Sequence, residues 1–200
     1  MIRSRKPRVI VLAGPNGAGK STAGPTLIRK TLGVTRFVDA DMIARGLDPK
    51  APARAAIRAG RVMLRRLREL AAKRVSFAFE TTLASRTFAP WIESLINDGW
   101  RFQLVFLWLP SPELAVARVR DRVRAGGHHV PEEVVRRRYE AGLRNFFGLY
   151  QPLASRWRVY DNTVDPAPII AAGTGRRTTE VRFPEIWKRI VKVYGRVKAP

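Results

Sequence analysis

The fold of this 200-residue chain is decided by one short stretch, Gly14-Pro15-Asn16-Gly17-Ala18-Gly19-Lys20-Ser21. Its spacing, Gly-x-x-x-x-Gly-Lys-Ser, is that of a Walker A loop, which binds phosphate groups largely through its backbone. A β-branched run at residues 8–13 precedes the stretch, and a helical pattern follows it. Since the motif works between a strand and a helix, the sequence predicts a phosphate-binding loop at the end of a buried first strand.

The residue types within this loop indicate what each position contributes. Glycines let the chain turn tightly, so that backbone N–H groups and the start of the next helix converge on phosphate oxygens. We expect Lys20 to reach the β- and γ-phosphates of ATP and the Ser21 hydroxyl to bind Mg²⁺. The expected nucleotide contacts within the loop are Gly14, Pro15, Asn16, Gly17, Ala18, Gly19, Lys20, Ser21 and Thr22.

Transporter-type ABC ATPases carry the same loop sequence and form an alternative class. Those proteins also need a Leu-Ser-Gly-Gly-Gln-like signature and an apolar strand that ends in Asp-Glu. Here the apolar run at residues 102–109 is followed by Pro110-Ser111, and Gly126-Gly127 is followed by two histidines. The sequence therefore argues against an ABC ATPase.

Strand-like and helix-like segments alternate along most of the chain, which predicts an α/β fold with a mainly parallel sheet. The expected strands lie at residues 8–13, 36–38, 75–79, 102–109 and 157–160. The expected helices lie at residues 20–31, 53–73, 86–98, 111–124, 131–148 and 185–197. After Asp161 the pattern weakens, and Pro- and Gly-rich segments indicate loops. We expect a P-loop domain over residues 1–163 and a basic C-terminal extension over residues 164–200, packed on the same domain.

Acidic residues follow the second expected strand. Ligands bind at the carboxyl ends of the strands in an open α/β sheet, so Asp39 and Asp41 are candidates for work on a bound substrate. Asp41 is the preferred general base, which would accept the proton of an acceptor hydroxyl. Asp39 has two open interpretations, a site residue or the N-cap of the next helix.

Polar residues also end the third expected strand. Glu80, Thr81 and Thr82 suit contacts to a polar acceptor or to the water shell of the metal, although an exposed strand end would look the same. Arg86, on the segment that follows, would face the phosphates of the acceptor or only the surface.

Two arginine-rich helical segments are joined by a Gly-Gly-His-His-Val-Pro loop. Arg118 and Arg122 are four residues apart and share one helix face. With Arg136-Arg137-Arg138 on the second segment, they predict a mobile lid over residues 118–138 that brings guanidinium groups over the γ-phosphate. The alternative is a solvated basic helix pair. His128 and His129 lack ligand partners at a convincing spacing, so we expect no zinc there.

The chain is strongly basic, with 38 Lys and Arg against 16 Asp and Glu and a formal net charge of +22. Such a charge attracts polyanions, including nucleic acid and nucleotides. Because the basic residues are spread over the whole chain, a nucleic-acid partner is possible but not favoured. The absence of cysteine excludes disulfides. The apolar run near the N-terminus is too short for a signal peptide or a membrane span, so we expect a cytoplasmic protein with no membrane contact.

Taken together, these segments resemble the zeta-toxin family, the P-loop kinases of bacterial toxin–antitoxin systems and their stand-alone relatives. The resemblance spans residues 8–163. It rests on the P-loop, on residues 37–44 and 79–84, on the Arg-rich loop at residues 122–131 and on Tyr160-Asp161-Asn162.

The resemblance implies an adenylate-kinase-like, three-layer αβα fold with a five-stranded sheet. It also implies ATP- or GTP-dependent phosphorylation of a sugar hydroxyl on a nucleotide sugar, UDP-N-acetylglucosamine in the toxin members. By this resemblance Lys20 is the P-loop lysine, Asp41 the general base, and Glu80 and Thr81 acceptor contacts. Lid arginines would hold phosphates, and we assign a catalytic role to Arg122 and nucleotide contacts to Arg118 and Arg137.

Two other classes of function stay open at this point. The basic surface would also suit a nucleic-acid-associated ATPase, whose ATP hydrolysis a polynucleotide would stimulate. A third possibility is a toxin that is neutralised by an antitoxin protein covering its ATP site.

Overall fold

The computed structural model describes residues 6–26, 33–49, 51–127 and 129–195. They form a seven-stranded sheet of order β2-β3-β1-β4-β5-β6-β7. The strands are β1 (Arg8–Ala13), β2 (Phe37–Val38), β3 (Phe77–Thr81), β4 (Arg101–Trp108), β5 (Arg156–Asp161), β6 (Ile169–Thr174) and β7 (Arg177–Val181). The first five pair in parallel, whereas β6 and β7 pair antiparallel. The expected α/β fold with a mainly parallel sheet is confirmed.

Helices connect the parallel strands, and one further helix follows β7. They are α1 (Lys20–Thr26), α2 (Ala40–Leu47), α3 (Ala56–Ala72), α4 (Phe88–Asn97), α5 (Pro112–Arg124), α6 (Glu132–Asn145) and α7 (Pro184–Tyr194). A 3₁₀ turn, η2 (Pro52–Ala55), precedes α3, and one π-helical segment, η3 (Phe146–Tyr150), continues α6. The expected helix over residues 20–31 extends beyond Thr26 into a segment that lies outside the described residues. None of the described helices has the length and apolar composition needed to cross a membrane.

The third strand begins two residues later than the sequence predicted. Arg74 has a φ of 51°, a left-handed conformation that carries the chain out of α3. The strand then starts at Phe77 and ends at Thr81. As a result Glu80 is the fourth residue of the strand and pairs in register with Leu12, close to the start of the P-loop.

The expected count of five strands was too low, because β6 and β7 extend the sheet. The sequence of β6 is rich in small residues, and β7 is a largely exposed, polar edge strand, so neither carries a clear alternation of apolar residues. Their place is fixed by packing. The ring of Trp187 on α7 stacks on Trp157 of β5 at 5.5 Å, and Trp157 Nε1 donates a hydrogen bond to Gly175 O.

Gly173 gives a direct test of this packing. A Cβ atom there would lie 2.7 Å from Cε2 of Trp157 and would overlap the carbonyl oxygen of Arg177. Gly173→Ala is therefore expected to lower the free energy of unfolding by about 1–3 kcal/mol, as overpacking does in other cores. Urea denaturation followed by circular dichroism measures it.

Gly46 in α2 is the matched control, because a Cβ there meets no atom within 4 Å. Gly46→Ala should leave stability unchanged or raise it by up to about 1 kcal/mol, as removing a helical glycine does. Equal effects of the two substitutions would contradict the packing of β5 against β6.

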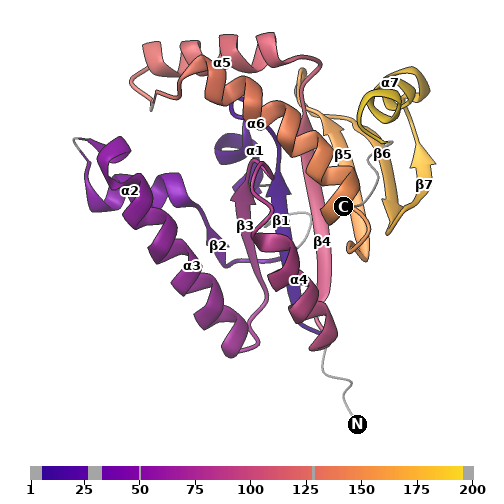
Figure 1. Ribbon diagram of the computed structural model, residues 1–200, viewed down its shortest axis with the longest axis horizontal. Coiled ribbons are helices and arrows are strands. Elements are labelled where there is room, and N and C mark those ends of the chain that lie inside the picture. Colours follow the sequence, from indigo (N-terminus) through magenta and orange to yellow (C-terminus); the bar gives the residue numbers. More distant parts are fainter. Residues whose placement is uncertain (1–5, 27–32, 50, 128, 196–200) are drawn as a thin grey trace.

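The strand that leads into the P-loop lies in the middle of the sheet. Val9 to Ala13 of β1 are fully buried between β3 and β4, which makes the loop's starting point rigid. Figure 1 shows β1 and β3 pointing toward the end of the sheet that α5 and α6 cross, with α2 and α3 to one side. The carboxyl ends of the strands therefore open toward these helices.

Candidate active site

The P-loop between β1 and α1 contains glycines at positions where a residue with a side chain would not fit. Gly14, Gly17 and Gly19 have φ values of 145°, 78° and 70°, all in the region that favours glycine. A Cβ on Gly14 would overlap the carbonyl oxygen of Leu107 on β4, and one on Gly17 would lie 2.7 Å from the carbonyl oxygen of Ala115 on α5. The loop is thus held against the neighbouring strand and helix as well as by its own turns.

Lys20 points back into this loop. Its Nζ donates hydrogen bonds to Gly14 O and Pro15 O, both at 2.9 Å, and the residue is 7% exposed. Burial lowers the pKa of the ammonium group, while the nearby carboxylates of Glu80 and Asp41 oppose this shift. The positive charge is therefore concentrated at the centre of a backbone cradle that suits an anion.

Three carboxylates meet beside the loop. Asp39 is the N-cap of α2, and its Oδ1 accepts hydrogen bonds from the backbone N–H groups of Asp41 at 2.7 Å and Met42 at 3.4 Å. Glu80 Oε2 accepts a hydrogen bond from Ser21 Oγ at 3.1 Å. One carboxylate oxygen from each of Asp39, Asp41 and Glu80 lies within 4.8 Å of the others.

Asp39 and Glu80, with the adjacent Ser21 hydroxyl, fit a divalent cation. Among the described residues, no hydrogen-bond donor reaches the buried Asp39 Oδ2. Carboxylate and hydroxyl oxygens are the ligands that Mg²⁺ prefers, and the Ser21 hydroxyl lies beside the cluster. The two interpretations of Asp39 are therefore compatible, because its Oδ1 caps α2 and the residue also belongs to the carboxylate cluster. Asp41 is exposed on the first turn of α2 and lines the cleft.

Burial raises the pKa values of both Asp39 and Glu80. A raised pKa means that the folded protein holds a proton more tightly than the unfolded chain does. The free energy of unfolding contributed by such a group therefore falls as the pH rises above its ordinary value, 4.5 for glutamate.

Glu80→Gln is expected to make the free energy of unfolding of the nucleotide-free protein less dependent on pH between 4.5, the ordinary glutamate value, and neutrality. Glutamine keeps an acceptor for Ser21 but cannot ionise. Urea denaturation at several pH values measures the slope, and Glu93→Gln, an exposed change on α4, is the control. If both variants keep the wild-type slope, the pKa of Glu80 is not raised in the folded protein.

Arg118 lies beside the P-loop and also holds the turn that follows β5. Its Nη1 donates to Asn162 O at 2.7 Å and its Nη2 to Thr163 O at 3.5 Å, in the turn that follows β5. Asn162 Nδ2 in turn donates to Ala18 O of the P-loop at 2.8 Å. Arg118 lines the cleft, but two of its N–H groups hold the turn that supports the loop.

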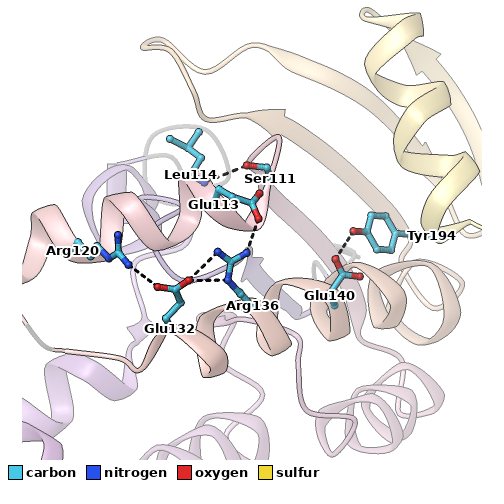
Figure 2. Close-up of polar contacts among 8 residues, drawn as sticks. All are labelled: Ser111, Glu113, Leu114, Arg120, Glu132, Arg136, Glu140 and Tyr194. Carbon is cyan, nitrogen blue, oxygen red and sulfur yellow. Dashed lines mark hydrogen bonds and ion pairs between the residues drawn. The ribbon is translucent and has the colours of Figure 1, made fainter.

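The other lid arginines divide into two groups. Arg122, Arg137 and Arg138 line the cleft. Arg136 points away from it and bonds Glu132 on its own helix and Glu113 on α5 (Figure 2). Glu132 also pairs with Arg120 of α5 at 2.6 Å, so an ion-pair network fastens the two helices on their outer side. Burial lowers the pKa of Arg138, as does the neighbouring charge of Arg137.

The cleft has a volume of about 1350 Å³ and runs from the P-loop to α3 and the start of α4. Pockets for one small ligand have about 300–1,000 Å³, so this cleft has room for two ligands side by side. The expected site residues that line it are Asn16, Gly17, Gly19, Lys20, Ser21, Thr22, Asp41, Glu80, Thr81, Thr82, Arg118, Arg122 and Arg137.

Some residues fall outside the expected pattern. Arg86 is exposed and does not line the cleft. His129 lines a separate cavity of about 280 Å³ between α5 and α6, and His128 lies outside the described residues. Arg45 also lines the cleft, although it was not among the residues expected from the sequence. Its position four residues after Asp41, on the same face of α2, could have identified it.

The strand order and the loop after the central strand define a P-loop NTPase-like α/β fold. A family model described as an AAA domain matches residues 9–148, and the chain belongs to this family.

Individual known proteins are similar to this chain at low sequence identity. An uncharacterized protein of Haemophilus influenzae is 29% identical over 132 residues, which cover 66% of this chain and 92% of that protein. The structure of the AvrRxo1-ORF1:-ORF2 complex with ATP has a TM-score of 0.70 at 17% identity, over 98% of this chain and 66% of that one. The PezAT toxin–antitoxin structure from Streptococcus pneumoniae has a TM-score of 0.64 at 16% identity, over 98% and 81%.

A gluconokinase from Sinorhizobium meliloti is similar along nearly its whole length. Its TM-score is 0.51 at 18% identity, over 96% of this chain and 94% of that one. At these identities the structural likenesses describe the fold alone. The chain also spans only 66% of the AvrRxo1-ORF1:-ORF2 chain that it matches.

Proposed function

We propose that this protein is a kinase that transfers the γ-phosphate of ATP to a hydroxyl group of a small acceptor. The observation that carries the proposal is the position of Asp41. Its carboxylate is exposed in the same cleft as Lys20 and Ser21, and the cleft has room for a nucleotide and a second molecule. A carboxylate so placed is free to accept a proton, as an acceptor hydroxyl requires.

The residues divide the reaction between them. Asp41 takes the proton as the acceptor oxygen forms its bond to phosphorus, and the bond to the ADP oxygen breaks. Lys20 and Arg122 stabilise the charge on the transferred group, and the glycine-rich loop orients the phosphates. Ser21, Asp39 and Glu80 would hold Mg²⁺, which neutralises charge on the phosphates when it is bound. Arg118 supports the loop through Asn162.

Two hydroxyls are placed to orient the acceptor. Thr81 Oγ1 accepts a hydrogen bond from Leu83 N at 3.1 Å, and Thr82 Oγ1 accepts one from Ala84 N at 3.4 Å. Each hydroxyl still has its own hydrogen to donate toward an oxygen in the cleft. Both residues line the cleft, as does the half-buried Glu80.

The acceptor is, in our proposal, a nucleotide sugar such as UDP-N-acetylglucosamine, and the enzyme is zeta-toxin-like. Arg45, Arg137 and Arg138 line the cleft and give it the positive charge that a diphosphate requires. The likeness to the PezAT toxin–antitoxin structure supports this and makes an antitoxin protein a candidate partner. A cytoplasmic location would supply the ATP.

The strongly basic surface favours one rival, a nucleic-acid-associated ATPase. The deciding experiment incubates the protein with γ-labelled ATP and Mg²⁺ in the presence of nucleotide sugars, nucleosides or oligonucleotides. We expect label on a nucleotide sugar. If the label appears only as inorganic phosphate, the kinase proposal is wrong. ATP hydrolysis that oligonucleotides stimulate and salt suppresses would favour the nucleic-acid-associated ATPase.

A further inference from the structure

The turn between β3 and α4 contains a residue with an unfavourable backbone conformation. We refer to residues 82–85 as the β3–α4 turn; Thr82, Ala84 and Ser85 line the cleft. Leu83, between them, has a φ of 57° and is fully buried. A branched, non-glycine residue rarely adopts this left-handed conformation, and it persists only where surrounding contacts impose it.

Those contacts come from α6 and η3, more than 50 residues further along the chain. Asn145 Nδ2 donates hydrogen bonds to two consecutive carbonyls of the turn, Leu83 O at 2.7 Å and Ala84 O at 3.2 Å. The Tyr150 hydroxyl donates to the next carbonyl, Ser85 O, at 2.8 Å. Three successive carbonyls are therefore held from one helical segment, which orients the cleft-facing side of the turn.

The backbone of α6 itself packs on the same turn. A Cβ added to Gly142 would overlap the carbonyl oxygen of Thr82. On the same helix, Arg138, four residues before Gly142, and Ala141, directly before it, line the cleft. The spacing of residues 138, 141, 142 and 145 puts them on one helix face. One face of α6 therefore connects the cleft arginines with the β3–α4 turn.

The far side of α6 is fastened independently of this turn. Its first residues are tied to α5 through Arg136, and Glu140 accepts a hydrogen bond from the Tyr194 hydroxyl of α7 at 2.9 Å (Figure 2). The helix is thus tied to α5 and to α7 by contacts that do not involve the β3–α4 turn.

We propose that Asn145 is a positioning residue for the acceptor: it holds the β3–α4 turn in its left-handed conformation, so that Thr82 and Ser85 meet the acceptor. The inference rests on the proposed kinase function. In this proposal Asn145 does not contact the nucleotide. Substitution of Asn145 should therefore weaken acceptor binding without weakening ATP binding.

Asn145→Asp tests the proposal because aspartate has the same shape but sets an oxygen against the two carbonyls. We expect the acceptor KM for UDP-N-acetylglucosamine to rise at least tenfold, with a smaller change in kcat. The dissociation constant of a fluorescent ATP analogue should stay within twofold. Hydrogen–deuterium exchange should become faster in the peptide that covers residues 82–87.

Tyr150→Phe removes a second donor while keeping the ring, and should change the same quantities in the same direction. Arg144→Gln, an exposed change beside Asn145 on α6, should change none of them. Unchanged exchange in residues 82–87 of the Asn145→Asp protein, or an equal loss of ATP binding, would overturn the inference. If the wild-type protein leaves UDP-N-acetylglucosamine unmodified, the proposed acceptor fails, and the exchange and ATP-binding measurements still decide the role of Asn145.

Discussion

Asp41→Asn is expected to remove phosphoryl transfer and to leave ATP binding intact. Asparagine keeps the size and the polar character of the side chain at this exposed position of α2, but it cannot accept the acceptor proton. Loss of a general base costs about 10²–10⁴-fold in rate. Single-turnover transfer of label from ATP measures the rate, and titration with a fluorescent ATP analogue measures binding.

The control for this substitution is Asp98→Asn, an exposed carboxylate just before β4, at the opposite end of the sheet from the cleft. It should transfer phosphate at the wild-type rate. Full activity of Asp41→Asn would mean that another group is the base. Loss of both binding and transfer would instead mean that Asp41 acts on the nucleotide.

Lys20→Ala is expected to abolish detectable nucleotide binding, and with it transfer. The ammonium group is the one buried lysine charge among the described residues, and it is directed into the backbone cradle of the P-loop. Removing one partner of a buried charge pair costs about 2–5 kcal/mol, which corresponds to at least about 30-fold in affinity. Equilibrium binding of the ATP analogue measures the loss.

The stability of the Lys20→Ala protein separates binding from folding. Burial lowers the pKa of Lys20, so the charged form of this lysine does not stabilise the nucleotide-free folded protein. Urea denaturation should therefore show a folded variant of similar stability. Lys73→Ala, an exposed change at the end of α3, should bind ATP normally. Wild-type affinity in the Lys20→Ala protein would exclude the P-loop as the nucleotide site.

The P-loop itself could be predicted because its information is local. Spacing, flanking strand and following helix all lie within about 20 residues, and the glycines have the left-handed or otherwise special backbone that the motif needs. The N-cap at Ser111 is equally local, because its Oγ accepts a hydrogen bond from Leu114 N at 3.2 Å within the same turn. The closeness of Glu80 to Ser21, by contrast, arises from the parallel pairing of β1 with β3, which lie far apart in the sequence.

The directions of the lid arginines could not be predicted from the sequence. Arg118 and Arg136 look alike in the sequence, yet Arg118 bonds carbonyls in the turn after β5 and Arg136 bonds Glu113 and Glu132. In each case at least one partner is distant in the chain, so the helical period alone does not identify it. Arg86, chosen for its position after β3, lies on the surface outside the cleft for the same reason.

By itself, the sequence determined the phosphate cradle, the acidic strand ends and the mainly parallel α/β order, because each follows from residues close together in the chain. Only the tertiary structure decided that the sheet has seven strands and that Asn162 supports the P-loop. It also decided that Asn145 holds the β3–α4 turn. These features arise where segments far apart in the sequence pack together, and they are set by shape and hydrogen-bond geometry, which no local pattern encodes.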